Sequence, residues 1–235
     1  MKATELGAAV GRTSYPGRGI ILGRSEDNKS VYIGYFIMGR SENSRNRVFE
    51  ETSDGIRTAA WDPSKVSDPS LIIYHPVRRY NGCTIVTNGD QTDTIRDYMA
   101  EGFTIREALL SREFEPDSPN YTPRISGMVM PTGNYKLSIL KTYNGDPSCC
   151  CRYLFEYDKP IAGQGHYIHT YMGDGDPLPS FEGEPETVTV SGGIEEFGET
   201  IWDNLNEENR VALYVAKIRI DNGKVVFSKI FNKFE

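Results

Sequence analysis

The sequence predicts an α+β fold built on largely antiparallel β-sheet, with two sheets packed together and helices outside them. Three observations lead to this prediction. Strand-like segments outnumber helical ones, the helical segments are few and grouped, and the chain closes on two strand-like runs joined by Asp221-Asn222-Gly223. Asn-Gly is typical of hairpin turns, because the primed turns need positive φ. We expect one domain over residues 1–235, with residues 210–235 as an added C-terminal hairpin.

The strands are predicted from short apolar runs that turn residues bound on both sides. The clearest is Ser30–Met38 (SVYIGYFIM), which is rich in β-branched and aromatic residues, and Gly19–Leu22 precedes it. The other expected strands are Leu71–Tyr74, Cys83–Thr87, Ile125–Met130, Lys136–Thr142, Cys150–Tyr157, Tyr167–Tyr171, Thr187–Val190, Val211–Ile220 and Lys224–Phe231.

Three helices are predicted from their apolar spacing and their end residues. Thr92–Glu101 places apolar side chains on one face and stops at Gly102, and either Asp90 or Thr92 is suited to cap its start. Thr104–Glu107 has the pattern of a capping box and opens a helix that runs to Ser111. Ile194–Leu205 carries apolar residues at i, i+3, i+7, i+8 and i+11, which indicates an amphipathic helix.

Composition narrows the class of function. The chain has 235 residues, with 26 Lys and Arg against 33 Asp and Glu, for a formal net charge of −7. This charge argues against a general nucleic-acid binder, and no apolar run approaches the roughly 18 residues of a membrane span. The start, Met1–Gly11, lacks the apolar stretch of a signal peptide, and the four cysteines suit reduced thiols. We therefore expect a cytoplasmic protein.

Several common kinds of catalytic site are absent from the sequence. His166 and His169 form an H-x-x-H pattern, but they lie on a predicted strand, where residues three apart point to opposite faces. A shared metal is therefore not expected. The chain has no G-x-S-x-G elbow, no phosphate-binding Walker loop and no G-x-G-x-x-G opening a helix.

Three clusters of polar residues remain as candidates. Arginines lie in or beside glycine- and serine-rich turns at Arg18, Arg24, Arg40, Arg45 and Arg47, and a guanidinium at a strand end suits a phosphate, although any single one is most simply a surface residue. Asn88-Gly89 leads into the start of a helix, whose free backbone N–H groups are suited to bind an anion or a carbonyl oxygen. The alternative is a turn and a helix cap without a ligand. The third cluster consists of Tyr74, Glu113, Glu115, Asp117 and Arg124. These side chains are suited to acid–base catalysis, or they simply lie at the edge of the hydrophobic core.

The order and spacing of these segments from Tyr15 to Gly127 carry a resemblance. The matching residues are Tyr15-x-Gly17-Arg18, Gly23-Arg24, Arg40-Ser41, Asn46-Arg47, Tyr74, Asn88-Gly89, Thr92-Asp93-Thr94-Ile95, Glu115-Pro116-Asp117 and Thr122-Pro123-Arg124-Ile125. This half of the chain resembles the archaeal-type inosine monophosphate (IMP) cyclohydrolase family. NG-x-x-TDTI and TPRI are the more specific motifs, and the isolated Gly-Arg pairs are weak.

The resemblance implies a fold and a reaction. The implied fold is an N-terminal-nucleophile (Ntn) hydrolase-like α-β-β-α sandwich. The implied reaction closes the six-membered ring of 5-formamidoimidazole-4-carboxamide ribonucleotide (FAICAR), with loss of water, to give IMP at the end of purine synthesis. It needs no cofactor and no metal. The implied partner is a small purine nucleotide, FAICAR or IMP, rather than nucleic acid or membrane, and a homo-oligomer is common for enzymes of this size.

The resemblance also implies roles for individual residues. Arg47 and Arg124 would supply positive charge, Tyr74 would donate or relay a proton, and Glu115 would accept the carboxamide proton. The implied substrate-binding residues include Arg18 and Arg40 on the phosphate and Asn88 on the base or ribose, and the full set is Arg18, Arg24, Arg40, Asn46, Asn88, Gly89, Thr92 and Asp93.

Two departures from the family pattern keep alternatives open. Tyr121 stands between Asn120 and Thr122, where the family has Asn-Thr-Pro-Arg, and the segment between Arg40 and Arg47 is longer by two residues. One alternative is a purine-nucleotide-binding relative without turnover. A second is an amidohydrolase of the same fold, which needs an N-terminal Cys, Ser or Thr, whereas this chain begins Met1-Lys2.

Overall fold

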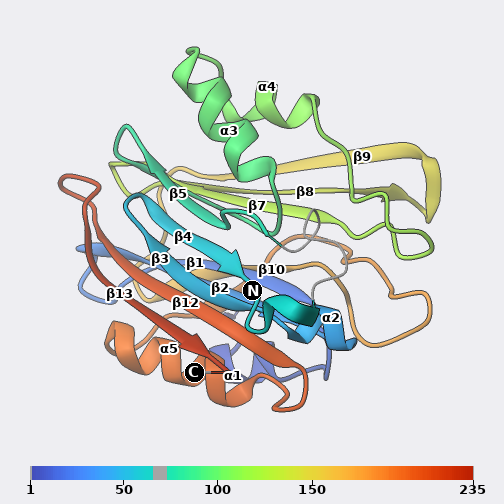
Figure 1. Cartoon of the computed structure of the whole chain (residues 1–235). Helices are drawn as coiled ribbons and strands as arrows, with labels where there is room; N and C mark the ends of the chain where they lie inside the picture. The colour runs from blue at the N-terminus through green and yellow to red at the C-terminus, as the bar shows by residue number, and fades with distance from the viewer. Residues whose placement is uncertain (1, 66–72, 235) are drawn as a thin grey trace.

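Two stacked antiparallel sheets form the framework of the computed structural model, which describes residues 2–65 and 73–234 (Figure 1). One sheet has six strands in the order β11-β10-β1-β2-β12-β13 and the other has seven in the order β3-β4-β5-β6-β7-β8-β9. The six-stranded sheet consists of β1 (Arg18–Arg24), β2 (Ser30–Met38), β10 (Gln164–His169), β11 (Glu186–Thr189), β12 (Arg210–Arg219) and β13 (Val225–Asn232). The seven-stranded sheet consists of β3 (Val48–Thr52), β4 (Gly55–Ala59), β5 (Val77–Tyr80), β6 (Cys83–Thr87), β7 (Arg124–Val129), β8 (Tyr135–Tyr143) and β9 (Asp146–Tyr157). The predicted α+β class is confirmed.

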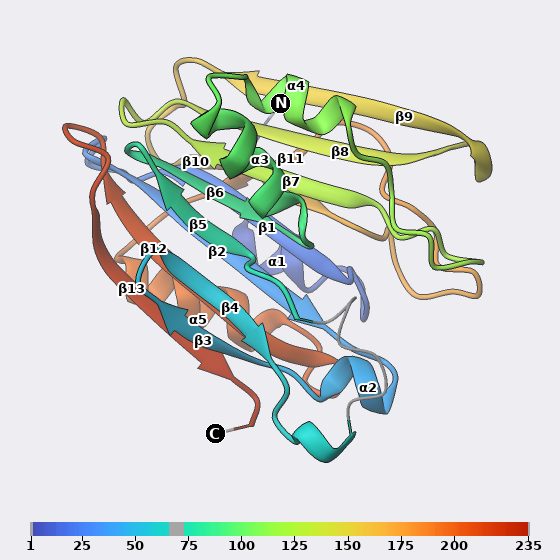
Figure 2. The same cartoon turned by 45° about the horizontal axis from the view of Figure 1, so that its top comes forward.

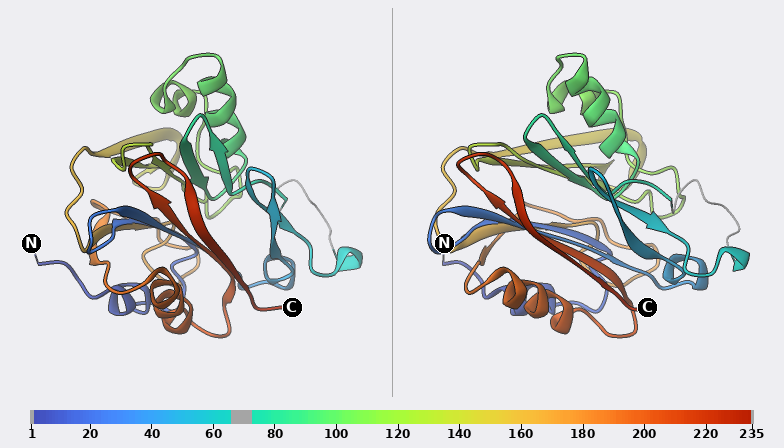
Figure 3. Two further views of the ribbon diagram at one scale, coloured as in Figure 1. Left: turned by 90° about the vertical axis from the view of Figure 1, so that its left-hand side faces the viewer. Right: turned by 60° about the vertical axis from the view of Figure 1, so that its left-hand side comes forward.

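Helices cover the outer faces of both sheets (Figure 3). α1 (Leu6–Val10) and α5 (Ile194–Asn204) pack on the six-stranded sheet, and α3 (Gln91–Ala100) and α4 (Ile105–Leu110) lie over the seven-stranded sheet. The short α2 (Glu42–Arg45) lies at one end of the molecule. No helix in residues 2–65 and 73–234 is both long and apolar enough to cross a membrane.

The main core lies between the sheets. Alternate residues of β1, Ile20 and Leu22, face the inner side, whereas Ile21 packs toward the helical layer outside. Gly34 on β2 lets α5 approach closely, because a Cβ there would lie 2.8 Å from Cδ1 of Ile201. Each such apolar side chain contributes about 1.5–3 kcal/mol when it is fully buried.

The structure contains the predicted strands and helices that have clear apolar patterns. It also contains polar strands that the sequence analysis did not predict. β3, β4 and β5 were not predicted, because they carry Glu, Arg and Thr rather than apolar runs. The predicted strand Leu71–Tyr74 lies partly outside the described residues, and its described part, Ile73 and Tyr74, is not in a strand. The capping box at Thr104 is confirmed. Asp90 is the N-cap residue of α3, but its side chain makes no capping hydrogen bond.

The C-terminal hairpin is part of the six-stranded sheet. β12 pairs with β2 on one side and with β13 on the other, so it occupies an interior position. Its side chains enter both cores, with Tyr214 between the sheets and Leu213 under the helices. That this hairpin is an addition to the family's domain stays a prediction.

Candidate active site

A group of buried and partly buried polar side chains comes from residues at the ends of strands in both sheets and from nearby loops. Arg18 begins β1, Arg124 begins β7, and Asn88 follows the last residue of β6. Loops bring Arg47, Tyr74 and Glu115 to the same group, and each of these three is less than 9% exposed. Electrostatic interactions link the five residues Arg18, Arg47, Tyr74, Glu115 and Arg124. We call these five the arginine cluster.

Arg47 is the most deeply buried charged residue of the cluster, at 1% exposed. Its Nε donates to the carbonyl of Ser44 at 2.8 Å and its Nη2 donates to the carbonyl of Met38 at 3.1 Å. Its Nη1 is buried and has no hydrogen-bond partner among the described residues, and the same holds for Nε of Arg18. Burial, and then the positive charge of Arg18, lower the pKa of Arg47. A buried and a partly buried guanidinium group that repel each other form a site suited to an anion.

Tyr74 is fixed by two neighbours. Its backbone N–H donates to Oγ1 of Thr58 at 2.9 Å, and its hydroxyl shares a hydrogen bond of 2.9 Å with the hydroxyl of Tyr35. Burial raises the pKa of Tyr74, although the charges of Arg47 and Arg18 act in the opposite direction. The Tyr74 hydroxyl is therefore protonated at neutral pH. Sequence reasoning missed Tyr35, because it is one aromatic residue within the apolar run of β2.

Glu115 is the carboxylate of the cluster. Burial raises the pKa of Glu115, and the opposing charges of Arg18 and Arg124 offset that effect only in part. In return, the Glu115 charge helps to raise the pKa of Arg18 above its usual value, against the effect of burial. The loop is fixed locally, because the Glu115 N–H donates to the carbonyl of Thr122 at 2.9 Å. A carboxylate with a raised pKa suits the acceptance of a proton near neutral pH.

Arg124 is held in place by the start of α3. Its Nη1 donates to Oδ1 of Asp90 at 2.7 Å and to Oε1 of Gln91 at 2.7 Å. A Cβ at Gly89 would lie 2.6 Å from this same Nη1 and 3.5 Å from Oε1 of Glu115. The Cβ would also lie 2.6 Å from Oε1 of Gln91, so any other residue at position 89 would displace the Arg124 or Gln91 side chain.

Asn88 and Thr92 use their side chains to hold the backbone together. Asn88 donates to the carbonyl of Pro123 at 2.9 Å and accepts from the N–H of Ile125 at 2.8 Å. Thr92 shares a hydrogen bond of 2.6 Å with Thr87. These contacts position the β6–α3 turn and the start of β7, which carries Arg124. That Asn88, Gly89 and Thr92 also contact substrate stays a prediction.

Two predicted binding residues lie at the rim of the cluster. Arg40 pairs with Asp174 at 2.5 Å and lies over the ring of Tyr15, at 5.1 Å from its centroid. Asn46 clamps a loop, because its Nδ2 donates to the carbonyl of Asp62 at 2.8 Å and its Oδ1 accepts from the Asp62 N–H at 2.7 Å.

Arg24 lies apart from the arginine cluster, and Asp93 pairs with a residue outside it. Arg24 is at the opposite end of β1 from Arg18, where burial lowers its pKa and its Nε and Nη1 have no partner among the described residues. Asp93 lies on α3 and pairs with Nε of Arg78 at 2.7 Å. The structure therefore brings Arg18, Arg47, Tyr74, Glu115 and Arg124 together and places Arg24 elsewhere. That Asp93, which also lies 3.7 Å from Nδ1 of His75, contacts substrate stays a prediction.

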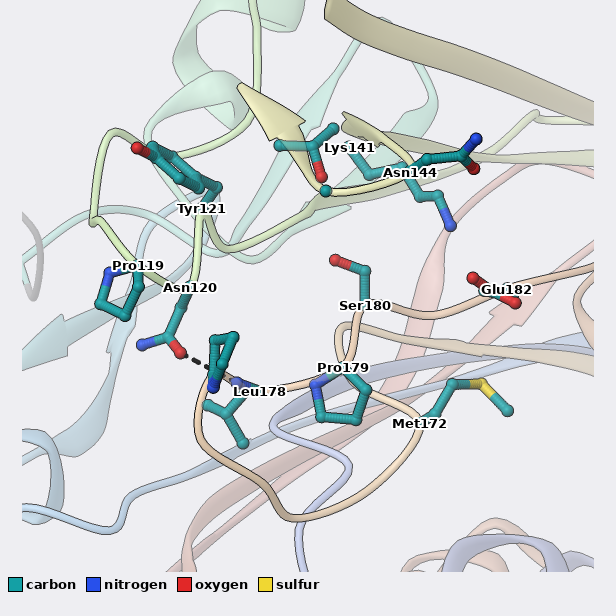
Figure 4. A pocket seen from close by; sticks show the side chains of 13 residues that line it. Pro119, Asn120, Tyr121, Lys141, Asn144, Met172, Leu178, Pro179, Ser180 and Glu182 are labelled. Atoms are coloured by element: carbon teal, nitrogen blue, oxygen red, sulfur yellow. Dashed lines mark hydrogen bonds between the residues drawn. The ribbon is translucent and has the colours of Figure 1, made fainter. Parts of the chain in front are cut away.

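A cavity of about 530 Å³ has no residue of the arginine cluster in its lining. Figure 4 shows the side chains that line it. It is lined by the loop around Asn120 and Tyr121, the end of β8 and the loop of residues 172–182. Asn120 accepts a hydrogen bond from the N–H of Leu178 at 3.0 Å. Tyr121, the residue that interrupts the family pattern, has φ of 43° and packs edge-on against Phe114. Tyr121 therefore forms part of this cavity wall.

Histidines and acidic residues do not gather around a metal position. No group of three or more His, Cys, Asp or Glu side chains with metal-binding geometry occurs in the part of the chain that the structure describes. His166 stacks on Tyr157, with ring centroids 3.6 Å apart, and burial lowers its pKa to about 4. His169 points to the other face and packs against Tyr167.

Comparison with known proteins agrees with this geometry. A profile of the IMP cyclohydrolase-like protein family matches residues 15–223, which includes every residue of the arginine cluster. The chain belongs to this family. Within the family, it is similar to proteins named IMP cyclohydrolase from archaea. One from Methanopyrus kandleri is 29% identical over 182 residues, covering 72% of this chain and 89% of the relative.

Two further relatives have the same name. The protein from Methanosphaera stadtmanae is 29% identical over 161 residues, which covers 67% of this chain and 73% of the relative. The protein from Methanothrix thermoacetophila is 33% identical over 119 residues, covering 49% of this chain and 57% of the relative. The likeness to the IMP cyclohydrolase-like family therefore extends well beyond the single motifs.

Proposed function

We propose that this chain is an IMP cyclohydrolase that closes the ring of FAICAR and releases water in the arginine cluster. The observation that carries the proposal is the pair of mutually repelling cations, the partly buried Arg18 and the buried Arg47, beside a buried tyrosine and a buried carboxylate. Glu115 is a single carboxylate beside these two cations, and a nucleotide monophosphate brings further negative charge to them. The family match and the archaeal relatives named IMP cyclohydrolase support the same activity. We also infer an Ntn-hydrolase-like fold, which the α-β-β-α layer order supports.

The chemistry places specific demands on the site. The carboxamide nitrogen attacks the formyl carbon, and the new C–N bond closes the ring. The carboxamide nitrogen gives up one proton and the formamide nitrogen another, and both leave with the formyl oxygen as water. The reacting groups occupy neighbouring positions on the imidazole ring, so the substrate itself supplies much of the proximity. The protein must therefore orient the formyl group, stabilise charge on its oxygen and move protons.

The cluster offers a residue for each demand. The free Nη1 of Arg47 is a buried donor for the developing oxyanion. The protonated hydroxyl of Tyr74 donates a proton to the departing oxygen, and Glu115 accepts the proton from the carboxamide nitrogen. Arg124, held by Asp90 and Gln91, adds positive charge next to Glu115.

Binding of the nucleotide is proposed for the surrounding residues. Arg18 and Arg40, which both lie near Tyr15, take the phosphate. Asn88, Gly89 and Thr92 shape the wall at the start of α3, and Asn46 holds the loop beside Arg47. Arg24 lies at the end of β1 opposite Arg18, and we propose no role for it in ring closure. For Asp93, contact with the substrate stays a prediction.

The test separates an enzyme from a nucleotide-binding relative. Purified protein is mixed with FAICAR, and IMP formation is followed by ultraviolet absorbance, while IMP binding is measured by calorimetry. We expect turnover well above the uncatalysed rate. Tight IMP binding without turnover would show a non-catalytic relative instead. The absence of both IMP binding and FAICAR turnover would overturn the proposal.

A further inference from the structure

β9 is a long sheet edge without a partner strand. It is the last strand of the seven-stranded sheet, and among the described residues it pairs only with β8. Figure 2 shows it along the rim of the molecule. The outward N–H and C=O groups of such an edge are a template for another strand, and proteins usually cover or interrupt them.

Each of the other three sheet edges contacts another segment of the chain. The edge of β11 bonds to the N-terminal segment, because the Thr4 N–H donates to the Thr187 carbonyl at 2.9 Å and the Thr189 N–H donates to the Thr4 carbonyl at 2.8 Å. On the edge of β3, the side chain of Asn232 accepts from the Phe49 N–H at 2.8 Å and donates to its carbonyl at 3.1 Å. β13 lies against β3. Among the described residues, no backbone group of β9 makes a hydrogen bond to a segment outside β8 and β9.

The side chains of β9 do not protect its edge. From residue 148 onward the strand has no proline and no lysine, and Tyr153 is 47% exposed. Its central segment, Arg152-Tyr153-Leu154-Phe155-Glu156, is self-complementary when read from both ends. The ends carry opposite charges, the next positions are aromatic, and a leucine is at the centre.

We propose that β9 pairs antiparallel with β9 of a second copy of this chain, about a two-fold axis through Leu154, to form a dimer. In this register Arg152 faces Glu156 of the second copy, and Tyr153 faces its Phe155. Each pair occurs twice, because the interface is isologous. Opposite charges and paired aromatics directly across an antiparallel ladder are stabilising. This inference is independent of the proposed activity.

Both charged side chains have room for a new partner. Arg152 donates from Nη2 to the carbonyl of Arg112 at 2.8 Å, and its side chain is still 31% exposed. Glu156 pairs with Lys136 at 2.6 Å, and its side chain is 46% exposed. Since a guanidinium has five N–H donors and a carboxylate accepts several, an Arg152–Glu156 pair between copies adds to the existing bonds.

Apolar surface flanks the edge on both sides. On the α4 side, a cavity of about 110 Å³ is lined by Leu110 and Leu154, and Leu110 is 53% exposed. On the inner side, a cavity of about 300 Å³ is lined by Tyr153, Phe155 and Phe181. A second β9 along this edge brings side chains to both cavities, which enlarges the contact beyond the backbone ladder.

Charge variants and their recombination test the register. Sedimentation velocity over a range of concentrations should show a dimer for the wild-type chain. Arg152→Glu and Glu156→Arg each place like charges together twice, so we expect each to raise the dimer dissociation constant about tenfold or more. The double variant R152E/E156R restores both pairs and should recover the dimer. Circular dichroism and thermal melts confirm that each variant is folded.

A disulfide placed on the two-fold axis is a second measurement. Residues directly opposite each other lie about 4.5–5.5 Å apart in an antiparallel ladder, which suits a disulfide. In a chain with Cys149, Cys150 and Cys151 changed to serine, Leu154→Cys should therefore cross-link two copies on oxidation. Arg152→Cys is the matched control and should not, because two such residues lie about 13 Å apart along the strands.

The proposal has clear contrary outcomes. A wild-type chain that stays monomeric at every concentration overturns it. A dimer that neither charge variant weakens overturns this interface, and a dimer in which Leu154→Cys fails to cross-link overturns this register.

Discussion

At the scale of single residues, the proposed mechanism makes the hydroxyl of Tyr74, and not that of Tyr35, the proton donor. Both substitutions to phenylalanine remove the same hydrogen bond, so each should lower the free energy of unfolding by about 0.5–1.5 kcal/mol. Only Tyr74→Phe removes the proposed proton donor. We expect Tyr74→Phe to lower kcat/KM by about 10²–10⁴-fold, with an effect of Tyr35→Phe below about tenfold. Steady-state kinetics of the two variants, compared with their thermal melts, check this prediction.

The raised pKa of Glu115 predicts the pH dependence of ring closure. A general base must be ionised, so activity falls as the pH decreases through its pKa. Because burial raises this pKa, the fall should occur at higher pH than for an ordinary glutamate. Glu115→Gln should lower kcat/KM and remove this acid limb of the profile. A Glu115→Gln profile with the same acid limb as the wild type would assign the limb to another group.

The residues of the site differ in how far the sequence could predict them. Arg18, Arg47, Tyr74, Glu115 and Arg124 were named from a family resemblance, and the fold brings them together. Spacing alone could not do so, because they come from segments spread over more than 100 residues. The sequence also could not show that Arg24 lies at the opposite end of β1 from Arg18. A Gly-Arg pair looks the same in the sequence whichever end of the sheet it occupies.

At the scale of secondary-structure elements, Asn88 joins three segments. Its side chain bonds to Pro123, Ile125 and Gln91, so Asn88→Ala leaves several buried polar groups unsatisfied. We expect the free energy of unfolding to decrease by about 2–4 kcal/mol, since each such group costs about 1–3 kcal/mol. Asn204→Ala is the control, because this exposed asparagine makes one hydrogen bond, to Thr200 within α5. It should cost less than about 0.5 kcal/mol in urea unfolding.

The position of β12 predicts the outcome of truncation. A chain ending at Asn209 loses an interior strand and exposes β2, so we expect no cooperative unfolding transition. A chain ending at Asn222 keeps β12 and loses only β13, and it should still melt cooperatively at a lower temperature. Circular dichroism melts of the two truncated chains provide the comparison. A cooperative melt of the shorter chain would mean that the hairpin is dispensable for the fold.

Elements with strong apolar patterns were predictable, and polar elements at the surface were not. β2 matches its predicted bounds because every residue in it is buried. β3 and β4 have exposed glutamate and arginine, and they form strands because they complete the seven-stranded sheet. Asp90 shows a second limit, because its carboxylate bonds to Arg112 and Arg124 instead of capping α3. Two arginines that are distant in the sequence therefore determine what the Asp90 side chain contacts.

At the scale of the whole molecule, the site lies between two sheets, and the proposed chemistry uses only arginine, tyrosine and glutamate side chains. We therefore expect the rate of ring closure to be the same with and without a chelator such as EDTA. Rates measured before and after chelation, with Mg²⁺ or Zn²⁺ added back, check this. A loss of activity that one of these metals restores would show that a group outside the arginine cluster takes part.

The structure of the complex with IMP tests the central claim most directly. We predict that the nucleotide lies between the sheets, in contact with Arg18 and Arg47, with its purine ring near Tyr74 and Glu115. The cavity beside Tyr121 is the main competing location, because it has the volume for a nucleotide but lies outside the arginine cluster. IMP bound in that cavity, without contact to Arg47 or Tyr74, would contradict the account.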